Sequence, residues 1–196
     1  MSTPSKGLLV VISGPSGVGK TTIVHKVQTA FQAIFSISAT TRPKSSSEVN
    51  GQDYFFISDE EFESKIQEDA FLEHAEVFGV HKYGTLRKPV NEALRDGKIM
   101  LLDIDVQGGK QVRDNMPNSL RIFILPPNED ELLRRLEARG REDSDSIQRR
   151  FREAKNEIKF ARESEAYEYF VTNDNLELAI AETIAIIQSE KEITHT

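Results

Sequence analysis

The chain has 196 residues and contains no cysteine. This absence excludes disulfide bonds, thiolate metal sites and a cysteine nucleophile, and it is consistent with a reducing compartment. Long apolar runs are also missing. The first apolar stretch, Leu8–Ile12, has only five residues, which is too short for a secretory signal or a membrane span. We therefore expect a soluble protein of the cytoplasm with no membrane partner.

Positively charged residues are also fewer than negatively charged ones. The chain has 25 Lys and Arg residues against 32 Asp and Glu residues, so its formal net charge is −7. An acidic surface of this kind disfavours non-specific binding to nucleic acid. Charged residues make up 29% of the chain and hydrophobic residues 38%, proportions typical of one globular domain.

Short aliphatic segments alternate with amphipathic ones along the chain. Runs of Val, Ile and Leu without polar breaks are typical of strands buried on both faces of a parallel sheet. The four predicted strands are 8–12, 99–102, 122–125 and 169–172. Apolar residues at helical spacing follow Lys20, recur from Ile147 to Ala161 and cover Leu176–Ile187. This alternation predicts an α/β fold with a parallel sheet flanked by helices and right-handed crossovers.

Two segments break the alternation. Ser36–Phe56 is rich in Ser, Thr and Gly and contains Asn50-Gly51, a strong hairpin-turn signal, so we expect a small, separate β-ribbon here. After it, Ser58 and Glu61 have the spacing of a capping box that opens a helix. Arg139–Asp145 is polar, contains a glycine and lies between two helical patterns, which predicts a mobile loop.

The strongest motif directly follows the first predicted strand. Its sequence, Gly14-Pro-Ser-Gly-Val-Gly-Lys20-Thr21, matches the phosphate-loop pattern G-x-x-x-x-G-K-[ST]. Glycines let backbone N–H groups close around a phosphate, and the helix that begins at Lys20 directs its positive dipole end at the anion. We expect Lys20 to reach the β- and γ-phosphates and the Thr21 hydroxyl to bind Mg²⁺. The alternative is a plain glycine-rich turn, but the full match favours binding of a nucleoside triphosphate.

A cluster of arginines narrows the class of phosphate-loop protein. Neither an Asn-Lys-x-Asp nor a Thr-Lys-x-Asp guanine signature occurs, which disfavours a GTPase, and seven arginines lie between Arg134 and Arg152. A phosphoryl-transfer enzyme needs cations around the migrating group, often on a closing lid. A solvated helix face with ion pairs accounts for most of the seven. Arg139 and Arg150 fit that explanation least, and we expect them to act from the lid.

Further motifs occur in a fixed order along the chain. They are Ser36-Ile-Ser-Ala-Thr-Thr-Arg42, Glu48-Val-Asn-Gly-Gln-Asp-Tyr54, Leu102-Asp-Ile-Asp-Val-Gln-Gly108 and the arginines of 135–150. Together with the phosphate loop they resemble the guanylate kinases, and the resemblance extends from about Leu8 to Ile187. The first two of these blocks taken together (T-T-R…E-x-x-G-x-D-Y), and the third (L-D-I-D-x-Q-G), are quite specific to that family, whereas the phosphate loop alone is not.

The resemblance implies a P-loop three-layer α/β fold with a parallel sheet flanked by helices, a small β-rich GMP-binding subregion and a helical lid. Within one domain spanning 1–196, the core would comprise about 7–35, 90–134 and 155–190, the GMP-binding subregion about 36–89 and the lid about 135–154. The implied reaction is Mg²⁺-assisted transfer of a phosphoryl group from ATP to GMP or dGMP in purine metabolism.

The resemblance also implies the residues that bind ATP and those that act in catalysis. The ATP-binding residues would be Gly14, Pro15, Ser16, Gly17, Val18, Gly19, Lys20, Thr21, Thr22, Arg135 and Asn173, the last of them near the adenine. The catalytic residues would be Lys20, Arg42, Arg139 and Arg150. Mg²⁺, bound by Thr21, would be the metal cofactor.

For the acceptor, guanine's own chemistry agrees with the residues that the resemblance implies. Its Watson–Crick edge offers two donors and the acceptor O6, and a carboxylate can accept from both donors, which an adenine edge cannot supply. The resemblance assigns this role to Glu73, with Asp103 at the exocyclic amine, while the hydroxyls of Ser38 and Thr85 suit O6. Taken alone, Glu73 could equally be an exposed helix-end carboxylate.

For the GMP phosphate, the resemblance implies Arg42 and the hydroxyls of Tyr54 and Tyr83, with Glu48 orienting the arginine. Singly, the two tyrosines could equally be half-buried strand aromatics. A one-residue expansion, Gly79-Val-His-Lys-Tyr83, precedes the second tyrosine and makes Tyr83 the expected equivalent of the family's residue.

The acceptor motif also departs from the family pattern. The usual second arginine, three residues after Arg42, is Ser45 here, and the glycine before the glutamate is Ser47. Serine cannot supply the bidentate fork of an arginine. We expect the GMP phosphate to be held more weakly, by about 1.5–3 kcal/mol, unless the neighbouring Lys44 supplies charge instead.

Two other functions compete with this one. Guanylate-kinase-like domains that only bind partners are similar to this chain but lack an intact phosphate loop, whereas Gly14, Gly19, Lys20 and Thr21 are all present here. A P-loop kinase could instead phosphorylate a sugar phosphate such as ribose bisphosphate, and the missing arginine keeps this alternative open.

Overall fold

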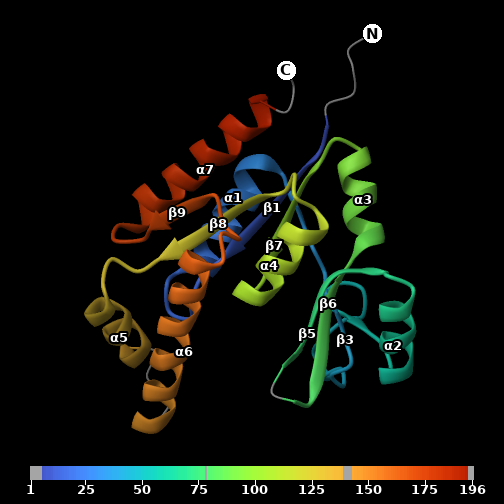
Figure 1. Ribbon diagram of the computed structural model, residues 1–196, viewed down its shortest axis with the longest axis horizontal. Coiled ribbons are helices and arrows are strands. Elements are labelled where there is room, and N and C mark those ends of the chain that lie inside the picture. The colour runs from blue at the N-terminus through green and yellow to red at the C-terminus, as the bar shows by residue number, and fades with distance from the viewer. Residues whose placement is uncertain (1–5, 78, 139–142, 194–196) are drawn as a thin grey trace.

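Two β-sheets organise the chain and lie beside each other in the molecule (Figure 1). The computed structural model describes residues 6–77, 79–138 and 143–193. The larger sheet has five parallel strands in the order β2-β7-β1-β8-β9. Their bounds are β1 Leu8–Ser13, β2 Ile34–Phe35, β7 Ile99–Asp103, β8 Leu120–Leu125 and β9 Tyr169–Thr172. The four predicted strands are confirmed; the two-residue edge strand β2 is an addition.

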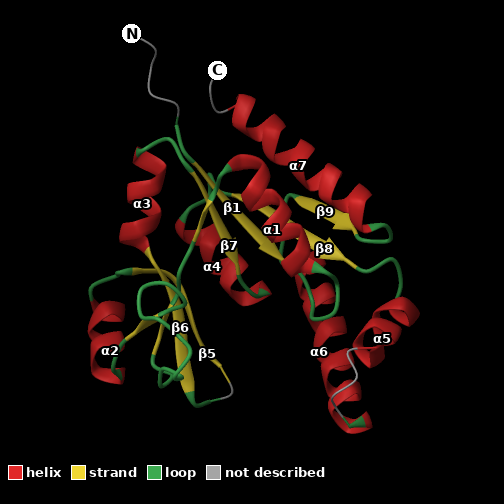
Figure 2. Cartoon of the chain, turned by 180° about the vertical axis from the view of Figure 1, so that it is seen from behind, coloured by secondary structure: helices red, strands yellow, loops and turns green. Residues whose placement is uncertain are grey.

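Helices cover both faces of the larger sheet because its strands are apolar on both sides. Leu8, Val10 and Ile12 of β1 belong to the core shared with α1 (Lys20–Phe31) and α7 (Leu176–Ile193). Leu9 and Val11 point the other way, into the core shared with α3 (Arg87–Arg95) and α4 (Val106–Asn115). Figure 2, viewed from behind, brings α1 in front of the sheet. The predicted three-layer α/β architecture is therefore confirmed.

The smaller sheet has four strands in the order β4-β3-β6-β5. The strands are β3 Ala39–Thr40, β4 Phe55–Phe56, β5 Phe71–Val77 and β6 His81–Leu86. Helix α2 (Asp59–Gln67) packs on this sheet through Phe62, whose ring stacks on that of Phe71 with centroids 4.4 Å apart. The Ser58 hydroxyl accepts a hydrogen bond from the Glu61 N–H at 3.1 Å and caps α2, as the sequence predicts.

The strands expected over Ser36–Phe56 are separate from the larger sheet, as predicted, but the hairpin pairing that the turn signal implied is wrong. The Asn50-Gly51 turn exists, but it is closed locally, with the Gly51 N–H donating to the Tyr54 carbonyl at 2.8 Å. β3 and β4 run parallel instead of forming a hairpin, and β3 pairs antiparallel with β6. Asn50-Gly51 thus predicted a turn correctly. The pairing partner of β3 is β6, a strand more than forty residues further along the chain.

Two helices follow β8 and pack on each other. They are α5 (Glu129–Ala138) and α6 (Ser144–Glu163), joined by apolar contacts that include Leu136 and Ala154. Residues 139–142 lie outside the described part. The loop expected through Asp145 ends earlier, because the Asp143 carboxylate accepts from the Ser146 N–H at 2.8 Å and starts α6 at Ser144. None of the described helices is long and apolar enough to cross a membrane.

Candidate active site

The phosphate loop lies between the end of β1 and the start of α1 and opens into a cleft of about 360 Å³. Gly19 has φ +90° and precedes α1 in the left-handed region that glycine tolerates. A Cβ there would lie 2.5 Å from Asn173 Nδ2, and this amide donates to the Val18 carbonyl at 2.7 Å. Asn173, the residue after β9, therefore supports the loop, a contact that the sequence did not predict.

Lys20, the predicted phosphate-binding lysine, faces a carboxylate across the cleft. Its Nζ lies 2.5 Å from Asp103 Oδ1. Asp103 is the last residue of β7, and its register partner Ile12 lies just before the phosphate loop. Parallel neighbours bring their carboxyl ends to the same sheet edge, which explains the meeting. The assignment of Asp103 to the guanine amine stays a prediction.

The donor set around Thr21 fits the Mg²⁺ that the phosphate loop implies. Thr21 lines the cleft together with Asp103 and Asp105, so hydroxyl and carboxylate oxygens of the kind Mg²⁺ prefers are present. Among the described residues, no group of three or more His, Asp or Glu side chains is placed to hold a metal ion. This arrangement suits a magnesium ion held mainly by substrate phosphates, with few protein ligands.

Glu157 is a cleft residue that sequence reasoning missed. It lines the phosphate-loop cleft from α6, and burial raises its pKa to about 7. Lys20 opposes this shift, while Asp105 and Glu153 add to it. Glu157 stands seven residues after Arg150, so both lie on one face of the helix. This seven-residue spacing from Arg150 is the sequence feature that could have identified Glu157 as a cleft residue.

Two of the predicted lid arginines contact the phosphate-loop region. The Arg150 guanidinium donates to the Ser16 hydroxyl of the loop. Arg135 donates from Nη1 to the Asn173 carbonyl at 3.0 Å and from Nε to Glu131 at 2.7 Å. Arg139 lies outside the described residues.

Glu73 forms a second part of the site, on the smaller sheet. It pairs with Thr85 across β5 and β6, and the Thr85 hydroxyl donates to Glu73 Oε1 at 2.6 Å. Both side chains are buried. Burial raises the pKa of Glu73 to about 6, the bond from Thr85 lowers it, and the nearby Asp105 carboxylate raises it further. A buried carboxylate with one oxygen not used by Thr85 is suited to accept donors from a ligand.

Helix α4 holds the strand that carries Glu73. The Gln111 side chain accepts from the His74 N–H at 3.1 Å and donates to the His74 carbonyl at 2.9 Å. Asn115 Nδ2 donates to the Leu72 carbonyl at 2.8 Å. Gly108 leaves room for the carboxylate, because a Cβ there would lie 3.0 Å from Glu73 Oε2. The smaller sheet is thus fixed to a helix of the larger one beside the pocket.

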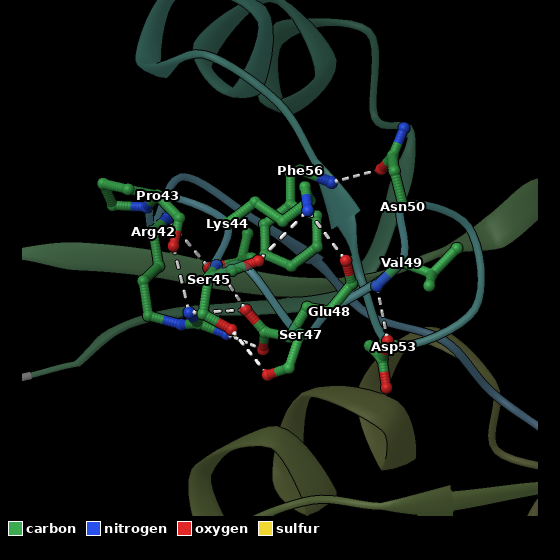
Figure 3. Close-up of polar contacts among 11 residues, drawn as sticks. Arg42, Pro43, Lys44, Ser45, Ser47, Glu48, Val49, Asn50, Asp53 and Phe56 are labelled. Atoms are coloured by element: carbon green, nitrogen blue, oxygen red, sulfur yellow. Dashed lines mark hydrogen bonds and ion pairs between the residues drawn. The ribbon is translucent and has the colours of Figure 1, made fainter.

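A third group surrounds Arg42 (Figure 3). Its guanidinium donates to both carboxylate oxygens of Glu48, at 2.5 and 3.0 Å. This pairing lowers the pKa of Glu48 to about 2 and raises the pKa of Arg42 above its ordinary value. The guanidinium also lies 5.3 Å from the ring centroid of Tyr54, and the Tyr83 ring lies 5.9 Å from that of Tyr54. Four predicted phosphate-site residues therefore lie together.

Ser45, which replaces the family's second arginine, forms hydrogen bonds within the loop that carries Arg42 and Glu48. The Ser45 N–H donates to Glu48 Oε2 at 2.8 Å, and Lys44 Nζ donates to the backbone carbonyls of Glu48 and Ser45 at 2.8 and 3.1 Å (Figure 3). Lys44 thus satisfies loop carbonyls in this arrangement. Its role as a substitute for the missing arginine stays a prediction. Ser38, just before β3, is half-buried, and its carbonyl accepts from the Phe55 N–H.

Comparisons with known proteins agree on one family. The family model described as guanylate kinase matches residues 6–190. Guanylate kinases from Clostridium acetobutylicum and Thermus thermophilus are each 45% identical to the chain over 186 residues, which is 95% of this chain and 87% and 83% of those proteins. The crystal structure of guanylate kinase from Anaplasma phagocytophilum superposes with a TM-score of 0.71 at 31% identity, covering 97% of this chain and 89% of that one.

Proposed function

The chain belongs to the guanylate kinase family and phosphorylates GMP with ATP, and we propose that its two sheets divide the substrates between them. The larger sheet holds ATP at the phosphate loop, and the smaller sheet holds GMP. The observation that carries the division is Glu73, a buried carboxylate on the smaller sheet that Thr85 leaves partly unused.

The ATP half rests on the phosphate-loop cleft. The loop amides and Lys20 bind the β- and γ-phosphates, and Asn173 keeps the loop in shape through the Val18 carbonyl. Bound with ATP, Mg²⁺ would be held by Thr21 and would supply positive charge across the phosphate oxygens. Because Lys20 is paired with Asp103 in this structure, ATP has to compete with that carboxylate. The remaining ATP-binding residues act as the family resemblance implies.

The GMP half rests on the Glu73 and Arg42 groups. Glu73 accepts hydrogen bonds from the two guanine donors, and Asp103 also accepts from the exocyclic amine. The hydroxyls of Ser38 and Thr85 donate to O6. Arg42 binds the GMP phosphate with the tyrosine hydroxyls. Glu48 holds the guanidinium by a two-point contact and so orients it.

Transfer needs positioning more than proton chemistry. An oxygen of the GMP phosphate attacks the γ-phosphorus in line, a new P–O bond forms, and the bond to the bridging oxygen of ADP breaks. The attacking phosphate is already largely ionised, so no strong base is required. Lys20, Arg42, Arg139 and Arg150 neutralise the charge that spreads over the transferring group.

The proposal extends to the organisation of the chain. Residues 36–89 form the acceptor subregion, 135–154 form the lid, and the remaining segments named above form the core. We place the enzyme in the cytoplasm, where its two nucleotide substrates occur.

A parallel assay tests the function. ADP formation is followed with Mg·ATP and, separately, GMP, dGMP, AMP, UMP, CMP and ribose 1,5-bisphosphate. We expect turnover with GMP and dGMP to exceed that with AMP by several orders of magnitude, because an adenine edge leaves the buried carboxylate unmatched. Equal turnover with GMP and AMP would contradict the guanine pocket. Preference for ribose 1,5-bisphosphate would instead favour the sugar-phosphate kinase, and no turnover with any acceptor would favour the binding module.

A further inference from the structure

A second hollow of the molecule lies away from the phosphate loop and is larger than the phosphate-loop cleft. It is a groove of about 1040 Å³ beside α3, α2 and the start of β5, and it shares no lining residue with the cleft. Helices α2 and α3 stand on the side of the molecule opposite α5 and α6 (Figure 1). Its lining residues are Lys6, Lys65, Ala70, Leu86, Arg87, Lys88, Pro89, Asn91, Leu94 and Arg95.

Five of the ten lining residues are cations and none is acidic, in a chain whose net charge is −7. Within the described part of the chain, no carboxylate forms an ion pair with Lys6, Lys88 or Arg95. Arg87 pairs with the Asp69 carboxylate and also donates from Nε to the Asp69 carbonyl, and Lys65 pairs with Glu61; the two carboxylate residues are 82% and 51% exposed. Such exposed pairs are weak and can exchange partners at small cost.

The charge of this groove is also unfavourable for the fold itself. Arg87 and Lys88 stand in the first turn of α3, which contains no acidic residue and has no side-chain cap. Cations at this end of a helix are opposed by the helix dipole. Lys65 and Arg95 add positive charge to the same groove. The cations and the start of α3 would therefore both favour a negatively charged ligand in the groove.

We propose that this groove is a binding site for a small molecule carrying two or more phosphate groups. The volume of about 1040 Å³ is at the upper limit for small-molecule sites, and the apolar members Ala70, Leu86, Pro89 and Leu94 give an uncharged surface for the rest of the ligand. Five cations in one groove do not make the extended basic track that a nucleic-acid backbone needs.

The groove lies where parts of both sheets meet, so a bound ligand would contact both of them. Lys65 and Ala70 belong to the smaller sheet and its helix, whereas Lys6 and Leu94 are tied to the base of the larger sheet, since the Gly7 N–H donates to the Leu94 carbonyl at 3.1 Å. A ligand that contacts both groups links the two sheets at the side away from the lid.

Amide NMR of the full chain tests the proposal without relying on activity. ¹H–¹⁵N spectra are recorded while inorganic triphosphate is added in the absence of nucleotide. We expect two sets of amides to shift with saturation: those of 14–21, because the phosphate loop binds triphosphate, and those of 65–70 and 86–91. The first set is an internal positive control, so failure of the phosphate loop to bind is distinguished from failure of the groove.

Two double charge-reversal variants test whether the shifts of the groove amides come from binding in the groove. Lys88→Glu with Arg95→Glu should raise the apparent Kd for the groove amides at least tenfold and leave the phosphate-loop titration unchanged. Lys26→Glu with Lys159→Glu changes the net charge equally at exposed lysines outside the groove and should leave both titrations unchanged. Absence of groove shifts at millimolar triphosphate, or equal losses in both double variants, would overturn the proposal. So would a short single-stranded RNA that shifts the groove amides at lower concentration than triphosphate does.

Discussion

A carboxylate buried among strand residues opposes folding unless it stays protonated or finds partners. Glu73 is in this position, with a pKa raised to about 6 from an ordinary value of 4.5. Between these two pH values the folded chain binds more protons than the unfolded chain, so the free energy of unfolding falls as pH rises through this window. Above about pH 6 the cost is fully present, on the order of 2 kcal/mol. In the proposed function, the binding of guanine's donors to the ionised carboxylate offsets this cost.

Glu73→Gln should therefore stabilise the nucleotide-free protein and impair its function. At pH 7.5 we expect the free energy of unfolding to rise by about 1–2 kcal/mol, because the amide needs no desolvated charge and can still accept from Thr85. The gain should vanish near pH 4.5, and KM for GMP should rise at least tenfold. Denaturant titrations at both pH values and steady-state kinetics measure these effects. Glu76→Gln, at an exposed position of the same strand, is the control, and an equal gain in both variants would refute the explanation.

The Ser45 substitution predicts a weak phosphate site that a single change should strengthen. Ser45→Arg adds a bidentate cation close to Arg42 and should lower KM for GMP by about tenfold or more. Ser46→Arg adds the same charge one position along the exposed loop and controls for attraction at a distance. Steady-state kinetics at fixed ATP compare the two. An unchanged KM in the Ser45 variant would mean that Lys44 already supplies the missing charge.

At the scale of elements, α6 joins the proposed lid to the phosphate-loop cleft. Arg150 and Glu157, two turns apart, both meet the phosphate-loop region, one at Ser16 and the other near Lys20. A movement of this helix therefore shifts a cation and a carboxylate together. Its start is defined by the Asp143 cap and its position by packing on α5.

Arg150→Ala tests whether this helix contributes to transfer. We expect kcat to fall by about 10³-fold or more with a much smaller change in KM for GMP, because the guanidinium stabilises charge that develops during transfer. Arg162→Ala removes an exposed arginine from the far end of the same helix and should leave kcat unchanged. A fall in kcat of less than tenfold in the Arg150 variant would mean that this arginine only belongs to a solvated helix face.

At the scale of the whole molecule, the proposed function places the two substrates on different sheets. The phosphate-loop cleft is lined by none of Arg42, Tyr54 and Tyr83, so the donor and acceptor phosphate groups do not share it in this structure. In-line transfer needs the reacting atoms about 3–3.5 Å apart. On the proposed assignment of the acceptor residues, the rest of the smaller sheet therefore has to move toward the phosphate loop when both sites are filled, while Gln111 and Asn115 hold its strand β5 on α4.

Small-angle X-ray scattering should detect this closure. With Mg·ADP and GMP together we expect the radius of gyration to fall by on the order of 1 Å from the roughly 16 Å typical of a compact chain of this length. Mg·ADP with AMP is the matched control, since AMP should not fill the guanine pocket. An identical radius with both nucleotide pairs would argue against closure by the acceptor.

Local patterns in the sequence determined the buried strands, the phosphate loop and the cap of α2, because each depends on neighbouring residues and on which faces they bury. The family motifs also named most of the candidate site. The hairpin of β5 and β6, which sets Glu73 against Thr85, was not predicted, nor was the parallel pairing of β3 with β4. The support that Asn173 gives to the loop was also missed. These features join residues far apart in the chain, and they depend on which strand edges and helix faces meet when the core is buried. Only the tertiary structure decided them, and it also brought Lys6 and Lys65 beside the three cations of α3 in one groove.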